Sequence, residues 1–276
     1  MASVKRAKGV GLRSTTFEIG LRAGLGWHAK IRPSNDAEIL EEEAEKVKWA
    51  SSFLPVANQA FVKSVPGISV LLSKTLDGSP SFDLVGALSS DKLIAGITEA
   101  TKQLRSVSVA NVPFNTPEWT RPDGIERNLG KLSVSRQKHR QLHPDFSRLT
   151  LAELRDIVDR GPGDQAKVLT HGDWCMPNVL LSQHGHITGI VDLGELHLGD
   201  ENLDPAIMSW TIRANMGDQW EDNYLNSLDL DSQDVGLNYQ RLIYDLGLEH
   251  SDPWSWLNDP ELFERRALAQ EFGAQQ

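Results

Sequence analysis

Residues 170–178 read Thr-His-Gly-Asp-Trp-Cys-Met-Pro-Asn, and this stretch decides the fold. The apolar pair Val168 and Leu169 precedes it, and the apolar residues 179–181 follow it directly. Short apolar runs on both sides of a polar segment predict two buried strands joined by a loop. Because loops held by a rigid scaffold carry much of the chemistry of proteins, we expect a functional site here.

A second predicted strand covers residues 186–191 and ends at Asp192, with Gly194 permitting a sharp turn. Asp173, Asn178 and Asp192 would then converge as oxygen donors from two neighbouring loops. Oxygen ligands of this kind suit Mg²⁺, which is usually bound by one or two carboxylates and by substrate phosphates. The pattern favours a phosphoryl-transfer site, in which Asp173 orients the attacking hydroxyl while Asn178 and Asp192 hold the metal.

Two other chemistries fit the residues poorly. His171, His184 and His186 could be imagined as zinc ligands, but the chain has neither an H-E-x-x-H nor a C-x-x-C frame. A serine hydrolase is disfavoured because no G-x-S-x-G is present. The single cysteine, Cys175, is interpreted as a small buried side chain rather than a nucleophile.

The composition is that of an ordinary globular protein, with 39% hydrophobic and 24% charged residues among 276. The formal net charge is −10, and residues 192–264 concentrate it, with 17 Asp and Glu against two Arg. An acidic segment repels nucleic acid and anionic lipid and favours cationic ligands. We therefore expect a small-molecule partner, and neither nucleic acid nor a membrane.

The sequence predicts a cytoplasmic protein. No run reaches the about 18–20 apolar residues that a membrane helix needs. Residues 1–8 are basic but are not followed by an apolar core, so they do not read as a secretory signal. One cysteine cannot form an internal disulfide, which fits a reducing compartment. Whether the chain is a monomer or a homodimer stays open.

The first part of the chain is patterned as strands around one helix. Residues 15–19 and 27–31 predict a β-hairpin, and residues 60–74 predict another. A helix is predicted over residues 36–54, where Pro55 stops it.

The rest of the chain is patterned mainly as helices. The 3.6-residue apolar period of residues 91–104 predicts a helix, residues 121–160 read as mostly helical, and further helices follow the predicted strands to the end of the chain. Turn formers at residues 73–80 indicate a hinge. We predict an α+β protein with a small β-rich lobe, residues 1–76, and a larger α-rich lobe, residues 77–276.

Together, H-G-D-x4-N at residues 171–178 and I-V-D-L-G at residues 190–194 resemble the aminoglycoside phosphotransferase family. The resemblance extends over roughly residues 9–250. It implies a bilobal protein-kinase-like fold and an enzyme that uses ATP and Mg²⁺ to phosphorylate a hydroxyl of a small molecule. The Cys-Met-Pro-Asn form at residues 175–178 is most similar to the aminoglycoside 3'-phosphotransferases, the kanamycin kinases, which implies an aminoglycoside 3'-hydroxyl as acceptor and a role in antibiotic resistance.

The resemblance also implies nucleotide-binding residues. A kinase needs a strand Lys on the phosphates and a helix Glu to orient it. Lys30 and Glu43 match in order and spacing, with Glu41 and Glu42 as rivals for the second role. Residues 9–16 would cover the phosphates through backbone N–H groups and hydroxyls, with Ser14 and Thr15 as candidates. The adenine would lie against residues 72–76.

In the resembling enzymes, carboxylates of the helical lobe bind the ammonium groups of the drug. The corresponding residues here are Glu195, Asp200, Asp245 and Glu249. For Asp200 and Asp204, which match the family's A-D-x-x-x-D pattern, a structural role at the catalytic loop is the favoured alternative.

Two departures from the family pattern concern the acceptor. Glu195 stands where kanamycin kinases usually have Arg, and residues 135–143 are basic where the family's substrate loop is usually acidic. These departures keep open a kinase of another hydroxyl-bearing antibiotic or metabolite. A non-catalytic nucleotide-binding protein is the third alternative, although it need not retain Lys30, Asp173 and Asp192.

Overall fold

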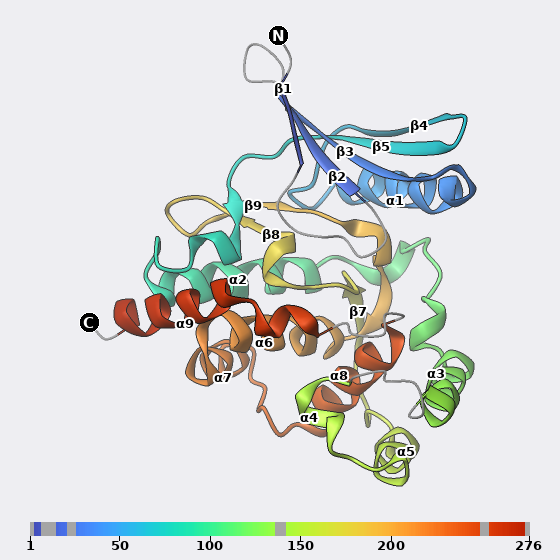
Figure 1. Ribbon diagram of the computed structural model, residues 1–276, viewed down its shortest axis with the longest axis vertical. Coiled ribbons are helices and arrows are strands. Elements are labelled where there is room, and N and C mark those ends of the chain that lie inside the picture. The colour runs from blue at the N-terminus through green and yellow to red at the C-terminus, as the bar shows by residue number, and fades with distance from the viewer. Residues whose placement is uncertain (1–2, 7–14, 21–25, 136–141, 249–253, 274–276) are drawn as a thin grey trace.

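The computed structural model describes residues 3–6, 15–20, 26–135, 142–248 and 254–273. The chain forms a smaller N-terminal lobe, built on a β-sheet with one helix, and a larger C-terminal lobe that is mostly helical (Figure 1). This arrangement confirms the predicted α+β class and the order of the two lobes.

The sheet of the N-terminal lobe has five strands in the order β1-β2-β3-β5-β4, and all neighbouring pairs are antiparallel. The strands are β1 (Ser3–Arg6), β2 (Thr15–Gly20), β3 (Gly26–Pro33), β4 (Ala60–Val65) and β5 (Ile68–Lys74). The two predicted hairpins are confirmed as the pairs β2–β3 and β4–β5. β1 was not predicted, because its residues Ser-Val-Lys-Arg show no alternation of apolar and polar side chains.

Helix α1 (Ala37–Ala50) packs against β4 and β5. Its buried face includes Leu40, Val47 and Ala50, which recur at the spacing of one helix side. The predicted end at residue 54 is wrong, because the helix ends at Ala50 and residues 51–54 form a turn. Pro55 restricts the backbone of Leu54 directly before it, but the helix ends four residues earlier.

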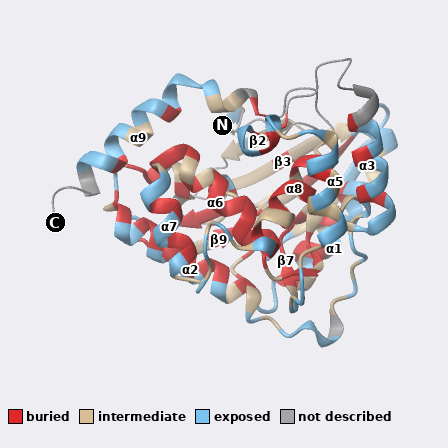
Figure 2. Ribbon diagram, turned by 90° about the horizontal axis from the view of Figure 1, so that it is seen from below, coloured by how far each residue is buried: buried red, intermediate tan, exposed pale blue. Residues whose placement is uncertain are grey.

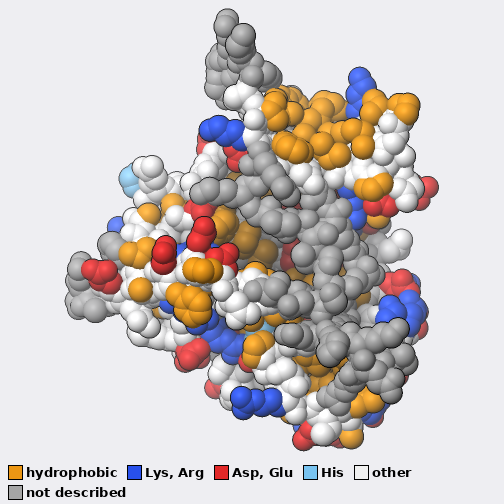
Figure 3. All heavy atoms as spheres, in the orientation of Figure 1, with side chains coloured by type: hydrophobic (Ala, Val, Ile, Leu, Met, Phe, Trp, Pro, Cys, Tyr) orange, Lys and Arg blue, Asp and Glu red, His pale blue; other side chains and the backbone are white. Residues whose placement is uncertain are grey.

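Hydrophobic side chains gather over β4 and β5 on the surface of the N-terminal lobe (Figure 3). Phe61, Val65 and Ile68 are between 41% and 48% exposed. Val65 lies directly opposite Ile68 in the ladder, and Phe61 meets Trp27 edge to face, so these side chains share one face of the sheet.

The helices of the C-terminal lobe surround α6, which is buried along nearly its whole length (Figure 2). α6 contributes apolar side chains to both hydrophobic clusters found among the described residues, such as Met208 in one and Trp210 in the other. The predicted helices at residues 91–104 and 121–160 are confirmed, the second as three helices. The helices are α2 (Ser90–Arg105), α3 (Pro122–Ser135), α4 (Pro144–Ser147), α5 (Leu151–Arg160), α6 (Leu203–Met216), α7 (Asp218–Asn226), α8 (Val235–Gly247) and α9 (Pro260–Gly273). Across the described ranges, no helix has the length and apolar character needed to cross a bilayer.

Short strands of the C-terminal lobe hold the loops between the lobes. The predicted strands on either side of residues 170–178 are confirmed as β7 (Lys167–Thr170) and β8 (Val179–Leu181), and the next as β9 (Ile187–Ile190). β8 pairs with β9 and with β6 (Ser79–Pro80), while β7 pairs with β10 (His197–Asp200). β10 was not predicted, because its four residues are too few to show a strand period. The lobe boundary after residue 76 stays a prediction.

Candidate active site

The loop at residues 171–178 joins β7 to β8, and a side chain of α6 holds it by hydrogen bonds. Gly172 has φ +81°, and a Cβ at this position would lie 2.7 Å from the carbonyl oxygen of Glu195. The carboxylate of Asp204 accepts hydrogen bonds from the backbone nitrogens of His171 at 2.7 Å and Gly172 at 3.0 Å. Burial raises the pKa of Asp204 to about 6, although both amides act to lower it. This geometry supports the structural alternative for Asp204.

His171 shapes the loop through both of its ring nitrogens. Nδ1 accepts from the backbone nitrogen of Asp173 at 3.3 Å, and Nε2 lies 2.9 Å from the carbonyl oxygen of Val191. A carbonyl oxygen can only accept, so Nε2 donates to Val191. His171 therefore ties Asp173 to the end of β9.

Asp173 is held by side chains from two directions. Asn178 Nδ2 donates to the backbone oxygen of Asp173 at 2.8 Å and to Oδ2 at 3.3 Å, and the Tyr244 hydroxyl donates to Oδ1 at 2.8 Å. Burial and the negative charge of Asp192 raise the pKa of Asp173, and hydrogen bonding to Tyr244 opposes this. A carboxylate held in this way can accept a proton from a substrate hydroxyl.

Asp192 and Lys30 meet across the two lobes. Asp192 follows β9 in a left-handed conformation, φ 64° and ψ 59°, which is uncommon outside glycine and concentrates at functional sites. Its Oδ1 lies 2.5 Å from Lys30 Nζ. Desolvation acts to raise the pKa of Asp192, but the charge and hydrogen bond of Lys30, together with the smaller effects of His171 and Arg32, lower it on balance. Asp192 is therefore an ionised carboxylate at neutral pH.

The helix partner of Lys30 is Glu43. Lys30 Nζ lies 3.0 and 2.8 Å from the two carboxylate oxygens of Glu43, which is buried on α1. Glu41 and Glu42 are exposed, and Glu42 pairs with Lys46 instead. The structure thus brings together the Lys–Glu pair expected from strand and helix order.

Lys46 is a site residue that the sequence analysis missed. It is 3% exposed and its Nζ donates to the carbonyl oxygen of Gly194 at 2.6 Å, which connects α1 to the turn after Asp192. Its position three residues after Glu43 on the same helix face was the available signal. Lys46 fastens the turn that carries Asp192.

The donor set near Asp173 fits Mg²⁺. Asp192 supplies an ionised carboxylate, and Asn178 supplies an amide oxygen, because its nitrogen is engaged by Asp173. These are hard oxygen ligands, as Mg²⁺ requires. The Asp192 carboxylate already binds one cation, the ammonium of Lys30, which shows that it is accessible to positive charge.

The alternative zinc site finds no support. Within the described ranges there is no group of three or more His, Cys, Asp and Glu able to hold a metal. His184 and His186 lie in the turn between β8 and β9, where both backbone nitrogens donate to Ser182 Oγ. Burial and the nearby Asp173 raise the pKa of the Cys175 thiol well above its usual value, so it is not a reactive thiolate.

Glu195 follows Asp192 in the next turn, and its backbone oxygen lies against the position of Gly172. Trp119 Nε1 donates to Glu195 Oε2 at 3.2 Å, and the Trp119 ring meets the Tyr244 ring edge to face with centroids 6.0 Å apart. Both aromatic residues were missed, because they lie in separate segments with no local motif. The negative charge of Glu195 also acts to raise the pKa of Asp173.

Two predicted substrate residues are buried inside the protein, which corrects the expectation for them. Asp245 is fully buried, and its carboxylate accepts hydrogen bonds from His143 N and Trp254 Nε1, both at 2.8 Å. Asp200 is 7% exposed and accepts from Asn202 N at 2.8 Å. Buried carboxylates with internal donors hold the fold together and are not available to a ligand.

Some predicted site residues lie at the end of a described range or outside the described ranges. Thr15 begins β2, opposite Ile31 of β3. Ser14, Glu249 and residues 136–141 of the basic segment lie outside the described residues, so their predicted roles stay predictions.

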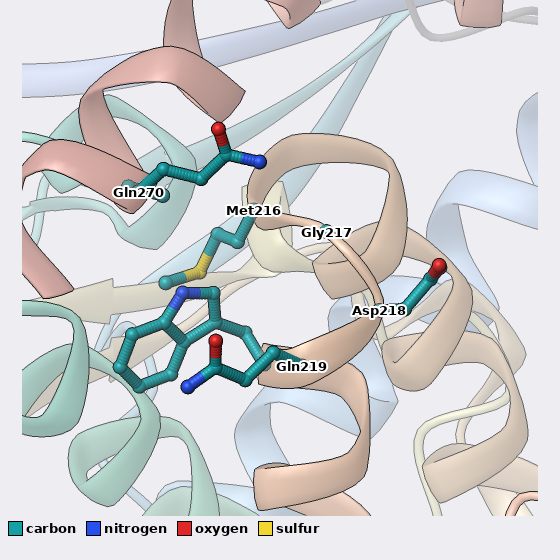
Figure 4. Close-up of a pocket in the computed structure, with 7 residues that line it drawn as sticks. Met216, Gly217, Asp218, Gln219 and Gln270 are labelled. Atoms are coloured by element: carbon teal, nitrogen blue, oxygen red, sulfur yellow. The ribbon is translucent and has the colours of Figure 1, made fainter. Parts of the chain in front are cut away.

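A pocket of about 210 Å³ lies elsewhere, between the α6–α7 corner and α9 (Figure 4). Met216, Gly217, Asp218, Gln219 and Gln270 line it together with Trp220 and Ala269. None of these residues belongs to the predicted site.

The site combines three features. Lys30 of a strand is paired with Glu43 of a helix, Asp173 lies on a loop of the C-terminal lobe, and Asn178 and Asp192 offer oxygen ligands for a metal. This combination is typical of a phosphotransferase of the protein-kinase type. The chain belongs to the phosphotransferase enzyme family, whose sequence pattern matches residues 8–237. The resemblance to aminoglycoside phosphotransferases is thereby confirmed, and the chain is an enzyme.

Relatives and solved structures agree with this assignment. The chain is 26% identical over 248 residues to the streptomycin 3''-kinase of Streptomyces griseus, covering 83% of this chain and 85% of that one. It is 22% identical over 201 residues to an aminoglycoside 3'-phosphotransferase of Niallia circulans, covering 68% and 71%. The fold matches an aminoglycoside-3'-phosphotransferase of type VIII with a TM-score of 0.69 at 17% identity, covering 89% of this chain and 93% of that one. It also matches aminoglycoside phosphotransferase APH(3'')-Id from Streptomyces rimosus in complex with ADP and streptomycin, with a TM-score of 0.66 at 20% identity, covering 89% and 92%. The protein-kinase-like fold is confirmed.

Proposed function

We propose that the protein transfers the γ-phosphate of ATP to a hydroxyl group of a cationic small molecule of the aminoglycoside class, with Mg²⁺ as cofactor. One observation carries the proposal. Lys30 links Glu43 to Asp192, while Asn178 and Tyr244 hold Asp173 in the adjoining loop. These are the groups that phosphoryl transfer requires, and they come from both lobes.

In this proposal the side chains of the protein act mainly by positioning the two reactants. Asp173 accepts a hydrogen bond from the substrate hydroxyl and takes its proton late, because the phosphoryl transition state is loose. Asn178 and Asp192 hold Mg²⁺, which when bound shields the negative charge of the phosphates. Lys30 adds a further positive charge on the nucleotide side.

The nucleotide is ATP in this proposal. Similar solved structures were obtained with ADP or AMP-PNP bound, which supports the same nucleotide class here. Residues 9–16, with Ser14 and Thr15, would cover its phosphates. The predicted hinge at residues 72–76 would receive the adenine.

The acceptor side favours a cation. Glu195 adds a second negative charge that acts on Asp173, and the segment of residues 192–264 is acidic throughout. A polycation such as an aminoglycoside is attracted to such a surface. The 3'-hydroxyl is the acceptor that the Cys-Met-Pro-Asn form predicts. The similarity to a streptomycin 3''-kinase over 85% of its length favours the 3''-hydroxyl of streptomycin as a second candidate.

We also propose that the enzyme works in the cytoplasm, where ATP and Mg²⁺ are available, and that it confers resistance on its host. Its assembly as a monomer or homodimer, and the absence of nucleic-acid partners, remain predictions from the sequence.

The test is ADP release by the purified protein with Mg·ATP and single acceptors. The acceptors are kanamycin, neomycin, streptomycin, a macrolide and several amino alcohols. Turnover of kanamycin or neomycin alone supports the 3' assignment, and turnover of streptomycin alone supports the second candidate. ATP binding without turnover of any aminoglycoside rejects the acceptor class.

Asp173→Ala is assayed in parallel. We expect it to lower turnover by roughly 10²- to 10⁴-fold, the contribution of a general base, while Mg·ATP binding persists. Wild-type turnover by the folded variant would remove Asp173 from its proposed role.

A further inference from the structure

Tyr244 ends a chain of contacts that begins on the acceptor side of the site. Glu195 Oε2 accepts from Trp119 Nε1 at 3.2 Å, and the Trp119 and Tyr244 rings meet edge to face at 76°. The Tyr244 hydroxyl then donates to Asp173 Oδ1 at 2.8 Å. A series of contacts through three separate segments therefore ends on the carboxylate of Asp173.

We propose that Tyr244 is a positioning residue for Asp173 and that Trp119 and Glu195 hold Tyr244 in place for this task. The inference rests on the proposed function, in which Asp173 accepts the hydroxyl of the acceptor. It assigns a role to the aromatic pair Trp119 and Tyr244, which no sequence motif indicates.

The hydrogen-bond geometry explains why the carboxylate needs this donor. Asn178 reaches Asp173 Oδ2 only at 3.3 Å, whereas Tyr244 reaches Oδ1 at 2.8 Å. Hydrogen bonds to an ionised acceptor are strong at the shorter distance, so Tyr244 sets the orientation of the carboxylate. Each carboxylate oxygen has two acceptor sites, which leaves room for a substrate hydroxyl.

The same hydrogen bond favours the ionised form of Asp173. Burial, Asp192 and Glu195 raise the pKa of Asp173, whereas the phenol hydrogen bond lowers it. Burial and the charge of Asp173 raise the pKa of Tyr244 well above its usual value, so the phenol stays a donor throughout the neutral range. The titratable and charged groups that face Asp173 are Asp192, His171, Tyr244, Glu195 and Cys175, with Lys30 acting through Asp192.

The first test is Tyr244→Phe, which keeps the ring and removes the donor. We expect kcat to fall roughly 10- to 100-fold, as for a misplaced catalytic group, with an unchanged KM for ATP. Tyr239→Phe, on the same helix but half-buried near Asp200, is the matched control and keeps the wild-type kcat. Wild-type kcat in Tyr244→Phe overturns the proposal.

The second test needs no acceptor and so separates this inference from the proposed function. The ¹³C chemical shift of the Asp173 carboxyl carbon, assigned with Asp173→Asn, is measured at one fixed pH in the wild type and in Tyr244→Phe, because it reports the hydrogen bonding of the carboxylate. A third sample carries 3-fluorotyrosine at position 244, which keeps the shape and is a stronger donor. We expect the chemical shift to move in opposite directions in Tyr244→Phe and in the fluorinated protein. An unchanged chemical shift in the fluorinated protein, which retains the native packing, rejects the role even if Tyr244→Phe fails to fold.

Discussion

Lys30 and Asp192 are 162 positions apart in the sequence, and Lys30 Nζ lies 2.5 Å from Asp192 Oδ1. This contact joins β3 of the N-terminal lobe to the turn that follows β9 of the C-terminal lobe. Glu43 shares the same ammonium, so one cation balances two carboxylates. Lys30 therefore compensates the negative charge of one carboxylate from each lobe.

Lys30→Met tests this dependence through stability. Removing one partner of a buried ion pair costs about 3 kcal/mol, because the other charge is left uncompensated. Burial raises the pKa of Glu43 above its ordinary 4.5, and loss of Lys30 raises it further. A carboxyl whose folded pKa is raised destabilises the protein increasingly as pH rises above the unfolded value. Urea unfolding at pH 5 and pH 8 should therefore show the larger loss at pH 8.

The control for Lys30→Met is Lys48→Met, an exposed lysine on the same helix as Glu43. We expect this control to stay within about 0.5 kcal/mol of the wild type, as surface substitutions usually do. An equal loss for Lys30→Met at both pH values would show that Glu43 is not left as a buried charge.

Asp192→Asn tests the proposed metal ligand. The amide keeps the shape of the carboxylate but removes its charge, so the half-saturating Mg²⁺ concentration for ADP release should rise roughly 10- to 100-fold, with each 1.4 kcal/mol of lost attraction giving about a factor of ten. Asp164→Asn makes the same change at an exposed site in the loop before β7 and should leave the Mg²⁺ requirement unchanged. An Asp192→Asn enzyme with the wild-type Mg²⁺ requirement would exclude Asp192 as a ligand.

Gly172→Ala tests the fit of the catalytic loop. The φ of +81° at Gly172 would strain an alanine backbone. The added Cβ would also clash with the backbone oxygen of Glu195, at a distance of 2.7 Å. Gly67→Ala is the matched comparison, because Gly67 has φ +90° and nothing within 4 Å of an added Cβ. Strain alone costs about 1–2 kcal/mol, so Gly67→Ala should lose this amount and Gly172→Ala more, with roughly 10²-fold lower turnover. Equal losses and retained turnover would show that the loop tolerates a shift.

His197→Gln tests a buried neutral histidine behind the site. His197 is fully buried, its Nδ1 lies 2.7 Å from the carbonyl oxygen of Glu195, and burial lowers its pKa from 6.5 to about 4. The unfolded chain binds the proton first, so this group contributes stability above pH 6.5 that is lost as pH falls towards 4. The loss amounts to roughly 3 kcal/mol at 1.36 kcal/mol per pKa unit.

The measurement is the slope of unfolding free energy against pH between 7 and 4.5. His197→Gln should flatten it, whatever its effect at pH 7. His186→Gln, which changes an exposed histidine in the β8–β9 turn, should keep the wild-type slope. A wild-type slope in His197→Gln would assign the acid sensitivity to other groups.

The sequence by itself determined the elements that local patterns encode. Apolar runs around residues 170–178 gave the strands and the loop, and the order of strand and helix pointed to Lys30 and Glu43. Such features depend on neighbours in the chain, where side-chain periodicity and proline or glycine chemistry act directly. Oxygen donors at two neighbouring strand ends indicated the roles of Asp173 and Asp192, and the family resemblance then agreed with them.

Only the tertiary structure decided which distant side chains share the site. Tyr244 lies 71 positions from Asp173, and Trp119 lies 76 from Glu195, so no local period connects them. Asp245 carries the right charge for an ammonium ligand, but packing of α8 buries it against internal donors. Burial and long-range contacts follow from how whole elements pack, and that is why sequence could name the catalytic aspartate but not the residues that hold it.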